Sequence, residues 1–347
     1  MDPFPAAASS RAADTVPGAP ADGAAPRRGR RAGAVTRGER RVETGDRAPA
    51  GGDVAAAAGD AQAGAGPDTR DGAAMARPRR RDPARRNLPV AIGVGLALGL
   101  AVVLSLFLRR EGFVVLTAIA VIVAIWEIAN AFRARRIRIP LVPTVIGGVG
   151  MLASAYASGA DALFVSFALT STAILWWRVF EGGDAVRDVT AGIFTAAYVP
   201  YLAGFAVLML AAPDGVQRVM TFLIVTIASD VGGYLFGSFW GRHPLAPGIS
   251  PHKSWEGVAG SALLAAVAGG VSVALLMGSP WWVGVLLGVA ATAAATVGDL
   301  SESLLKRDLG MKDMGSLLPG HGGVMDRLDS LLPAAPVAYV LLLVLAP

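Results

Sequence analysis

The stretch SLLKRDLGMKDMGSLLPGHGGVMDRLD (Ser303–Asp329) is a polar segment between two apolar runs, 282–298 and 331–346, each of a length that can cross a bilayer. It holds two of the three lysines of the chain and one of its three histidines. The remaining lysine and histidines lie in one other loop, 239–256. This concentration of Lys and His in two loops indicates that the two loops carry the function.

The composition is that of an integral membrane protein. Hydrophobic residues make up 54% of the 347 residues, charged residues 16%, and the mean hydropathy is +0.53. Soluble domains carry about 25% charged residues. Cysteine is absent, which excludes disulfides and thiolate metal sites.

The apolar runs predict an all-α, polytopic helical membrane protein with about nine transmembrane helices. The expected helices are 88–108, 113–132, 141–158, 162–178, 189–211, 219–238, 257–277, 282–298 and 331–346. The third and fourth are short and close together, so a tight hairpin that does not fully cross is the alternative for them. We expect N-terminal transmembrane helices over 88–211 and a C-terminal catalytic region over 212–347.

Residues 1–87 form a basic tail of Ala, Gly, Pro, Arg and Asp. Residues 1–86 hold 16 Arg against 11 Asp and Glu, which accounts for the whole formal charge of +5. Such a segment buries too little apolar surface to offset the entropy of ordering, so we expect disorder. The tail lacks interleaved aromatic residues, which disfavours nucleic-acid binding. We hypothesise that Met75 is the true start of the chain.

Arginines near the ends of the apolar runs predict the orientation. The basic tail and the loop with Arg133, Arg135, Arg136 and Arg138 should face the cytoplasm. With nine spans, loops 239–256 and 299–330 then face the cytoplasm too. The expected location is the inner (plasma) membrane, multi-pass, with the active site on the cytoplasmic side.

Asp230 lies midway along the apolar run 219–238. A charged side chain at mid-membrane costs about 2.5–3.5 kcal/mol on insertion scales, so we interpret Asp230 as functional, with a structural hydrogen-bonding acid as the alternative. Gly232 and Gly233 follow, and they predict a locally broken helix that lines a polar cavity.

In the loop before the next apolar run, Ser250, Lys253 and Glu256 are candidates for binding a substrate. The alternative is a basic rim at the membrane surface. Three prolines exclude a continuous helix through this loop.

A helix continued past 298 would place Asp299, Ser303, Lys306 and Arg307 on one stripe. The turn PGHGG then leads into MDRLD, where Asp326 and Asp329 share a face at the start of the last helix. Their alternative role is helix capping. Oxygen ligands on neighbouring helices, with glycines that admit backbone N–H groups, suit Mg²⁺ and phosphate, and the scarcity of His and Cys disfavours zinc.

The segment resembles the C-terminal signature of the phosphatidate cytidylyltransferases, the CDP-diacylglycerol synthases. The matching residues are Ser303, Lys306, Arg307, Lys312, Asp313, Gly315, Pro319, His321, Gly322, Gly323, Asp326, Arg327 and Asp329. The segments SDVGGYLFG and SPHKSWEG resemble a second conserved region of that family, although His252 and Ser254 depart from the usual residues. The resemblance implies transfer of CMP from CTP to phosphatidate with Mg²⁺, at the lipid bilayer.

The resemblance and the residue chemistry together predict the roles. Asp299 and Asp326, assisted by Ser303 and completed by Asp313 and Asp329, would hold the metal. The triphosphate would be neutralised by Lys306, Arg307, Lys312 and Arg327, and His321, Gly322 and Gly323 would shape the nucleotide-phosphate turn. Lys253 and Ser250 would contact the lipid phosphate, with Glu256 in the same motif, and Asp230 would meet the lipid headgroup or a second cation.

Two other functions stay open. A cytidylyltransferase for a different lipid phosphate would have nearly the same sequence. An ion-coupled membrane transporter would also place an acid within a membrane helix, but its usual internal repeats are not visible. A homodimer is a further possibility that the sequence does not decide.

Overall fold

The computed structural model describes residues 88–181, 185–315, 317 and 322–346. The predictions for the tail, for Met75 and for His321 lie outside these residues.

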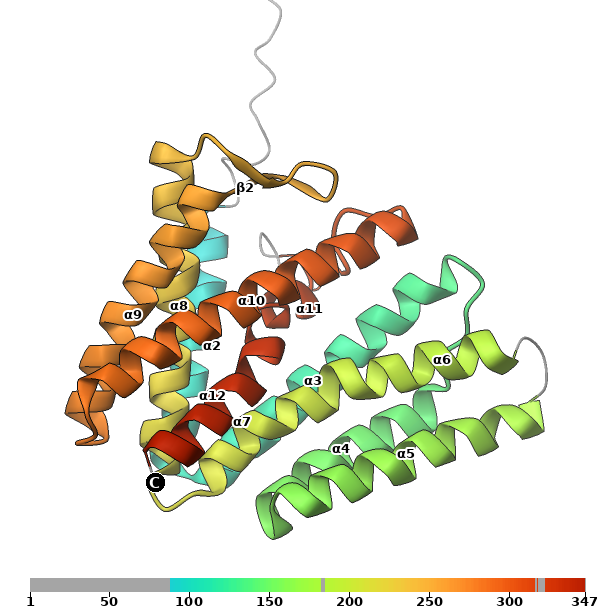
Figure 1. Cartoon of the computed structure of the whole chain (residues 1–347). Helices are drawn as coiled ribbons and strands as arrows, with labels where there is room; N and C mark the ends of the chain where they lie inside the picture. Colours follow the sequence, from blue (N-terminus) through green and yellow to red (C-terminus); the bar gives the residue numbers. More distant parts are fainter. Residues whose placement is uncertain (1–87, 182–184, 316, 318–321, 347) are drawn as a thin grey trace, which may run out of the picture. The chain divides into compact units, whose positions relative to one another are not determined.

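The chain folds into helices joined by short connections (Figure 1). The first four are α2 (Leu88–Leu108), α3 (Arg110–Arg133), α4 (Leu141–Ser158) and α5 (Ala160–Glu181). Next come α6 (Ala185–Ala196), the π-helical turn η1 (Ala197–Tyr201), α7 (Leu202–Ala211) and α8 (Gly215–Trp240). The strands β1 (Pro244–Ala246) and β2 (Ser250–Ser254) precede α9 (Trp255–Leu276), α10 (Trp281–Leu309), α11 (Met325–Leu328) and α12 (Leu331–Leu345).

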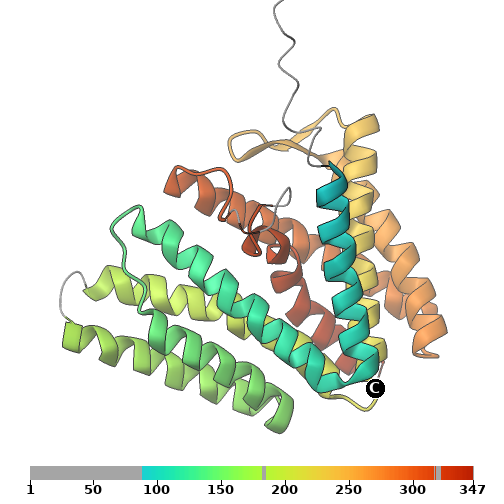
Figure 2. The same cartoon turned by 180° about the vertical axis from the view of Figure 1, so that it is seen from behind.

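All nine predicted apolar runs are helical, which confirms the fold class. Within the described residues, eight helical segments are long and apolar enough to cross a membrane. The remaining run is α2, which is apolar but shorter than a full span over Gly93–Leu108, the part whose side chains the structure describes. Figure 2 shows α2 and α3 on the side of the molecule that faces away in Figure 1.

Helices α4 and α5 have 18 and 22 residues and pack against each other. They are joined at Gly159, whose φ of 86° lies in the region that glycine adopts without strain. Both helices have the length of a full span, so the structure favours two crossings over the shortened hairpin.

The predicted break in the helix at Gly232 and Gly233 is wrong. Helix α8 runs unbroken through 26 residues. The two glycines instead allow α9 to approach, since a Cβ at Gly232 would lie 2.5 Å from the carbonyl oxygen of Gly260 and one at Gly233 would lie 2.6 Å from Oγ of Ser261. Small residues that bring backbones together are the usual means of packing membrane helices.

Helix α9 packs against both α8 and α10, and α10 is the longest of the three (Figure 1). Its 29 residues correspond to about 44 Å at 1.5 Å per residue, more than the roughly 30 Å of a hydrocarbon core. Its last turns therefore have the length to reach beyond the hydrocarbon. The helix ends at Gly310, with φ 71°, where the N–H of Met311 donates to the carbonyl of Lys306.

The loop between α8 and α9 holds a short antiparallel hairpin that the sequence did not predict. Pro244 pairs with Ser254 and Ala246 with Ser250. Ser254 also caps α9, because its hydroxyl accepts the N–H of Gly257 at 3.1 Å. The hairpin and this cap together fix the position at which α9 begins.

Candidate active site

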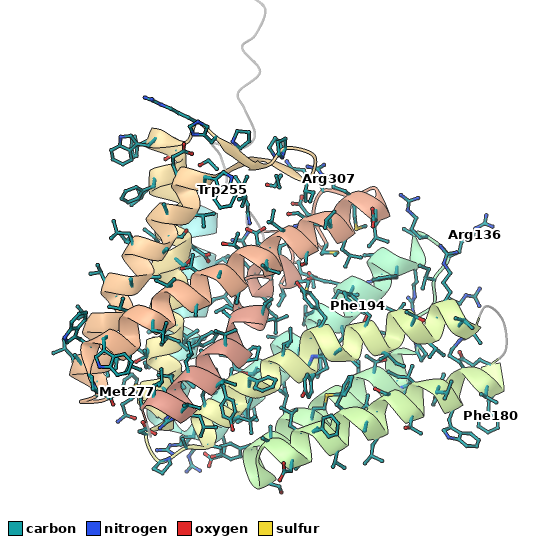
Figure 3. All side chains as sticks on the ribbon, in the orientation of Figure 1. Arg136, Phe180, Phe194, Trp255, Met277 and Arg307 are labelled. Atoms are coloured by element: carbon teal, nitrogen blue, oxygen red, sulfur yellow. The ribbon has the colours of Figure 1, made fainter. Side chains whose placement is uncertain are left out.

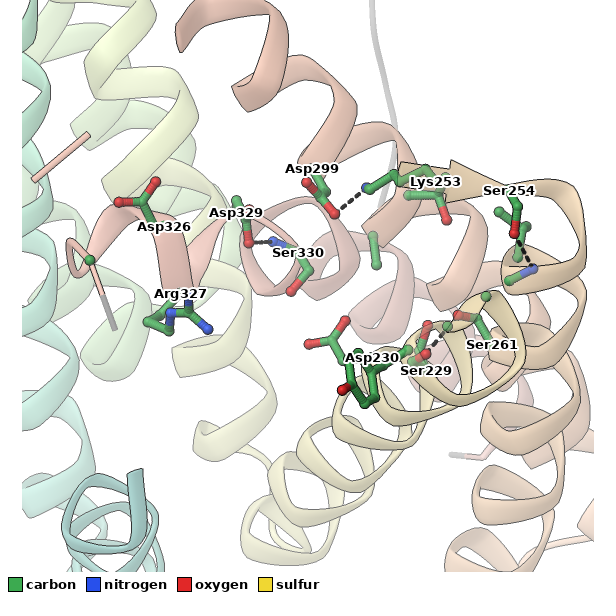
Figure 4. Close-up of a pocket in the computed structure, with 18 of the residues that line it drawn as sticks. Ser229, Asp230, Lys253, Ser254, Ser261, Asp299, Asp326, Arg327, Asp329 and Ser330 are labelled. Atoms are coloured by element: carbon green, nitrogen blue, oxygen red, sulfur yellow. Dashed lines mark hydrogen bonds and ion pairs between the residues drawn. The ribbon is translucent and has the colours of Figure 1, made fainter. Parts of the chain in front are cut away.

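A cavity of about 780 Å³ lies where α8, the hairpin, α9, α10 and the segment 313–330 meet (Figure 4). Eight acidic and basic residues of the described chain line it: Asp230, Lys253, Asp299, Lys306, Asp313, Asp326, Arg327 and Asp329. All eight were predicted as site residues. The structure thus brings together residues from a membrane helix and from both polar loops.

Lys253 and Asp299 form an ion pair across the cavity, drawn in Figure 4. Lys253 is the last residue but one of β2, and Asp299 lies on α10 ten residues before its end. Their side chains are 24% and 36% exposed, so the pair remains accessible. The pair joins the two polar loops at one point.

Lys306 and Asp326 form a second pair. The Lys306 Nζ donates to Asp326 Oδ1 at 3.0 Å and to Glu302 Oε2 at 2.8 Å. Asp326 also accepts the N–H groups of Gly323 at 2.9 Å and Met314 at 3.1 Å. Asp326 therefore holds Met314 and Gly323, which lie near the two ends of the loop that precedes α11.

Asp230 reaches the cavity from within the membrane-spanning α8. Its neighbour Ser229 accepts from Ser261 through its carbonyl at 2.6 Å and from Thr292 through its hydroxyl at 3.1 Å. These contacts hold α8 against α9 and α10 at the depth of Asp230. The carboxylate of Asp230, which lies inside a membrane-spanning helix, therefore lines the same cavity as the loop residues.

Comparison with known proteins gives a consistent result. The Cytidylyltransferase family matches residues 89–345. The chain is 41% identical over 290 residues to the phosphatidate cytidylyltransferase of Mycobacterium leprae, covering 78% of this chain and 93% of that protein. It is 39% identical over 276 residues to the protein of that name from Mycobacterium bovis, covering 76% and 90%.

The chain belongs to the cytidylyltransferase family. The family match spans nearly all described residues, which confirms the resemblance predicted from the polar segment. It also makes this chain an enzyme that transfers a nucleotidyl group.

Glu302 of this cytidylyltransferase was not predicted as a site residue. It is 1% exposed, binds Lys306, and lies in contact with the carboxyl group of Asp329. Its spacing of four residues from Lys306 on α10 was a signal that could have found it.

Glu127 is the second residue that the sequence analysis missed. It lies on α3, is 1% exposed, and accepts the N–H of Met325 at 2.8 Å from 198 positions away. Its carboxyl group packs on Gly315 and Gly323, where an added Cβ would collide with it. An acid inside an apolar run was the available signal, the same one that identified Asp230.

Some predicted residues lie outside the cavity. Among the described residues these are Ser250, Glu256, Ser303, Arg307, Lys312 and Gly323, although Gly322 lines it. Glu256 faces the hairpin, where it contacts His243 Nδ1 at 2.5 Å and accepts the N–H groups of Arg242 and His243, both at 3.2 Å. The Arg307 side chain is exposed and donates to the carbonyl of Ile249 at 3.5 Å. Lys312 is exposed.

The charges of the cavity fit a divalent cation. Its described lining has five carboxylates and three cationic side chains, an excess of two negative charges. In the described part of the chain no group of three or more acids or histidines is arranged as a metal site. Mg²⁺ is commonly held by one or two carboxylates together with waters and substrate phosphates, so this lining suits that ion.

Proposed function

We propose that this enzyme transfers CMP from CTP to phosphatidate and forms CDP-diacylglycerol and pyrophosphate. The observation that supports this most is the single cavity shared by the intramembrane Asp230 and the loop residues Asp299 and Asp326. A lipid phosphate and a soluble nucleotide would meet in such a place. The names of the Mycobacterium relatives support the same reaction.

In this reaction a phosphate oxygen of phosphatidate attacks the α-phosphorus of CTP. The bond from that phosphorus to the oxygen bridging to the β-phosphate breaks, and pyrophosphate leaves with the electron pair. Two unit charges 4 Å apart at an effective dielectric near 20 interact by about 4 kcal/mol, so two polyanions need strong neutralisation. The enzyme must mainly position the phosphates and balance their charge.

We assign the lipid phosphate to Lys253 and the nucleotide phosphates to Lys306 and Arg327. Lys253 pairs with Asp299 across the cavity, and Lys306 and Arg327 lie beside Asp326. Lys253 pairs with Asp299 and Lys306 with Asp326, so an incoming phosphate would compete with a carboxylate for each ammonium group.

We propose that Asp299 and Asp326 hold Mg²⁺, with Asp329 and Asp313 nearby. Bound there, the ion would supply positive charge between the two reacting phosphates. A second cation near Asp230 is part of the same proposal. The excess of carboxylates over cationic side chains in the cavity supports both.

We further propose the plasma membrane as the location, with the cavity toward the cytoplasm. The arginine-rich end of α3 lies on the same side as the end of α10, since Arg135 Nε donates to the carbonyl of Leu309 at 3.2 Å. Arginine-rich loops face the cytoplasm. A homodimer remains a proposal that cross-linking of the protein in native membranes would test.

The test is incubation of the purified protein in detergent with labelled CTP, Mg²⁺ and one lipid at a time, followed by lipid extraction. We expect label in the lipid phase with phosphatidate, no label with phosphatidylcholine, and loss of product after chelation of the metal. Label transferred better to another lipid phosphate would show a different substrate. Label that stayed in the aqueous phase with every lipid would refute the proposed reaction.

A further inference from the structure

A second cavity, of about 1140 Å³, lies at the end of the helices α3 to α6. It is formed where α3 and α5 end and where α4 and α6 begin. None of the residues that line it lines the active-site cavity. It is therefore a separate feature that the proposed reaction does not use.

The base of this cavity is a buried ion-pair group. Arg178 binds Asp188 and Glu181, both at 2.5 Å, and Asp188 also accepts the backbone N–H of Arg138 at 2.8 Å. Arg178 and Asp188 are 5% and 3% exposed. The carboxylates of Glu181 and Asp188 are therefore already paired with the Arg178 guanidinium.

Three more arginines line the same cavity: Arg133, Arg136 and Arg138. All three are exposed, and none forms an ion pair within the described residues. Its described lining has four arginines against two carboxylates, an excess of two positive charges among those residues. An anion would be attracted to it.

Arg136 has a backbone conformation that favours glycine. Its φ is 60°, the one positive value at a non-glycine residue in the described chain. It follows α3 in a Schellman arrangement, in which the N–H of Ile137 donates to the carbonyl of Phe132 at 3.1 Å. An arginine therefore occupies this position at the cost of an unfavourable backbone conformation.

The wall of the cavity has the composition expected where a membrane meets water. Its wall includes Trp177 and Val142, which are 39% and 49% exposed, and Phe180 at the end of α5 is 80% exposed. Figure 3 shows Phe180 and Arg136 at the same end of this helix group. Exposed aromatic residues beside arginines at the ends of spans are typical of the interface with lipid headgroups.

We propose that this cavity binds the phosphate headgroup of an anionic glycerophospholipid, separately from the reaction. Planar guanidinium groups bind phosphate oxygens in pairs, and basic pockets between membrane helices take lipid headgroups. The apolar wall beside the arginines favours a lipid over a soluble phosphate, because acyl chains would continue along it.

The test is native mass spectrometry of the full-length protein in a non-ionic detergent, titrated with dioctanoyl phosphatidylglycerol. Counting bound lipids distinguishes this site from the active-site cavity, because the variants change no residue that lines the active-site cavity. The test variant is Arg136→Gly/Arg138→Gln. The glycine suits the backbone at 136, so a loss of binding would not come from unfolding. The matched control is Arg187→Gln/Arg242→Gln, two exposed arginines outside this cavity.

We expect the test variant to bind one phosphatidylglycerol about twenty-fivefold more weakly, at about fivefold per arginine, and the control to bind like wild type. The KM for phosphatidate should not change. Equal weakening in both variants, or in neither, would overturn the proposal. So would tight binding of glycerol phosphate that depends on the same arginines, because the site would then take soluble phosphates. A matching rise in KM would show that the cavity belongs to the reaction.

Discussion

Replacing Glu127 should impair the reaction although this residue does not line the active-site cavity. The Glu127 carboxylate accepts the N–H of Met325 at 2.8 Å next to the loop that Asp326 fixes. In Glu127→Ala that buried N–H would lose its charged acceptor, which costs about 1.5–3 kcal/mol. If this cost falls on the loop, the ratio of the ordered to the open loop drops by a factor of about 10 to 160. Glu127→Gln keeps one carbonyl oxygen as acceptor and should lose less.

The assay has two readouts. Turnover with CTP and phosphatidate should fall in Glu127→Ala, and hydrogen–deuterium exchange of the backbone at 322–329 should rise by the factor that describes loop opening. The matched control is Glu111→Ala on the same helix, an acid that accepts from Tyr156 at 3.2 Å and lies outside the active-site cavity. Normal turnover together with unchanged exchange in Glu127→Ala would refute the reasoning. Faster exchange with normal turnover would separate loop order from catalysis.

Three further predictions follow from packing and charge. In Gly284→Ala the new methyl group would meet the backbone of α9, so we expect destabilisation by about 1–3 kcal/mol in thermal unfolding, whereas Gly150→Ala, with open space around it, should be neutral. Asp188→Asn removes the charge of a buried partner of Arg178 and should cost about 3–5 kcal/mol in the same assay. Lys306→Met should abolish turnover because it removes a cation from the cavity, while Lys312→Met, an exposed position outside the cavity, should reduce it far less.

The helices and the charged lining could be predicted because both depend on local sequence. A run of apolar residues must satisfy its backbone within itself inside a membrane, so hydropathy alone identifies the spans. Asp299, Lys306 and Asp326 stand out because charges near a membrane are costly and few. Asp299 and Lys306 meet because α10 continues past the apolar run, whereas Asp326 reaches Lys306 because the chain folds back between α10 and α11.

The roles of glycines and of loop acids could not be predicted in this way. Gly232 and Gly233 are equally consistent with a broken helix and with close helix packing, and only the position of α9 decides between them. Glu256 lies in the same motif as Lys253, yet Glu256 faces the hairpin and Lys253 faces the cavity, because the chain passes from β2 into α9 between them. The contact between Glu127 and Met325 depends on the whole fold.

The pairing of acids with lysines bears on how the active site would accept its substrates. Asp299 and Asp326 each neutralise a lysine, so the cavity is an array of opposite charges with an excess of two carboxylates. A nucleotide triphosphate alone would meet that excess and be repelled. A divalent cation that engaged the two acids would release Lys253 and Lys306 for the phosphates. We therefore expect CTP to bind weakly in the absence of Mg²⁺ and to bind more tightly without Mg²⁺ in Asp299→Asn, as measured by equilibrium binding of labelled CTP. Equal affinity with and without Mg²⁺ in the wild type would show that the lysines are available from the start.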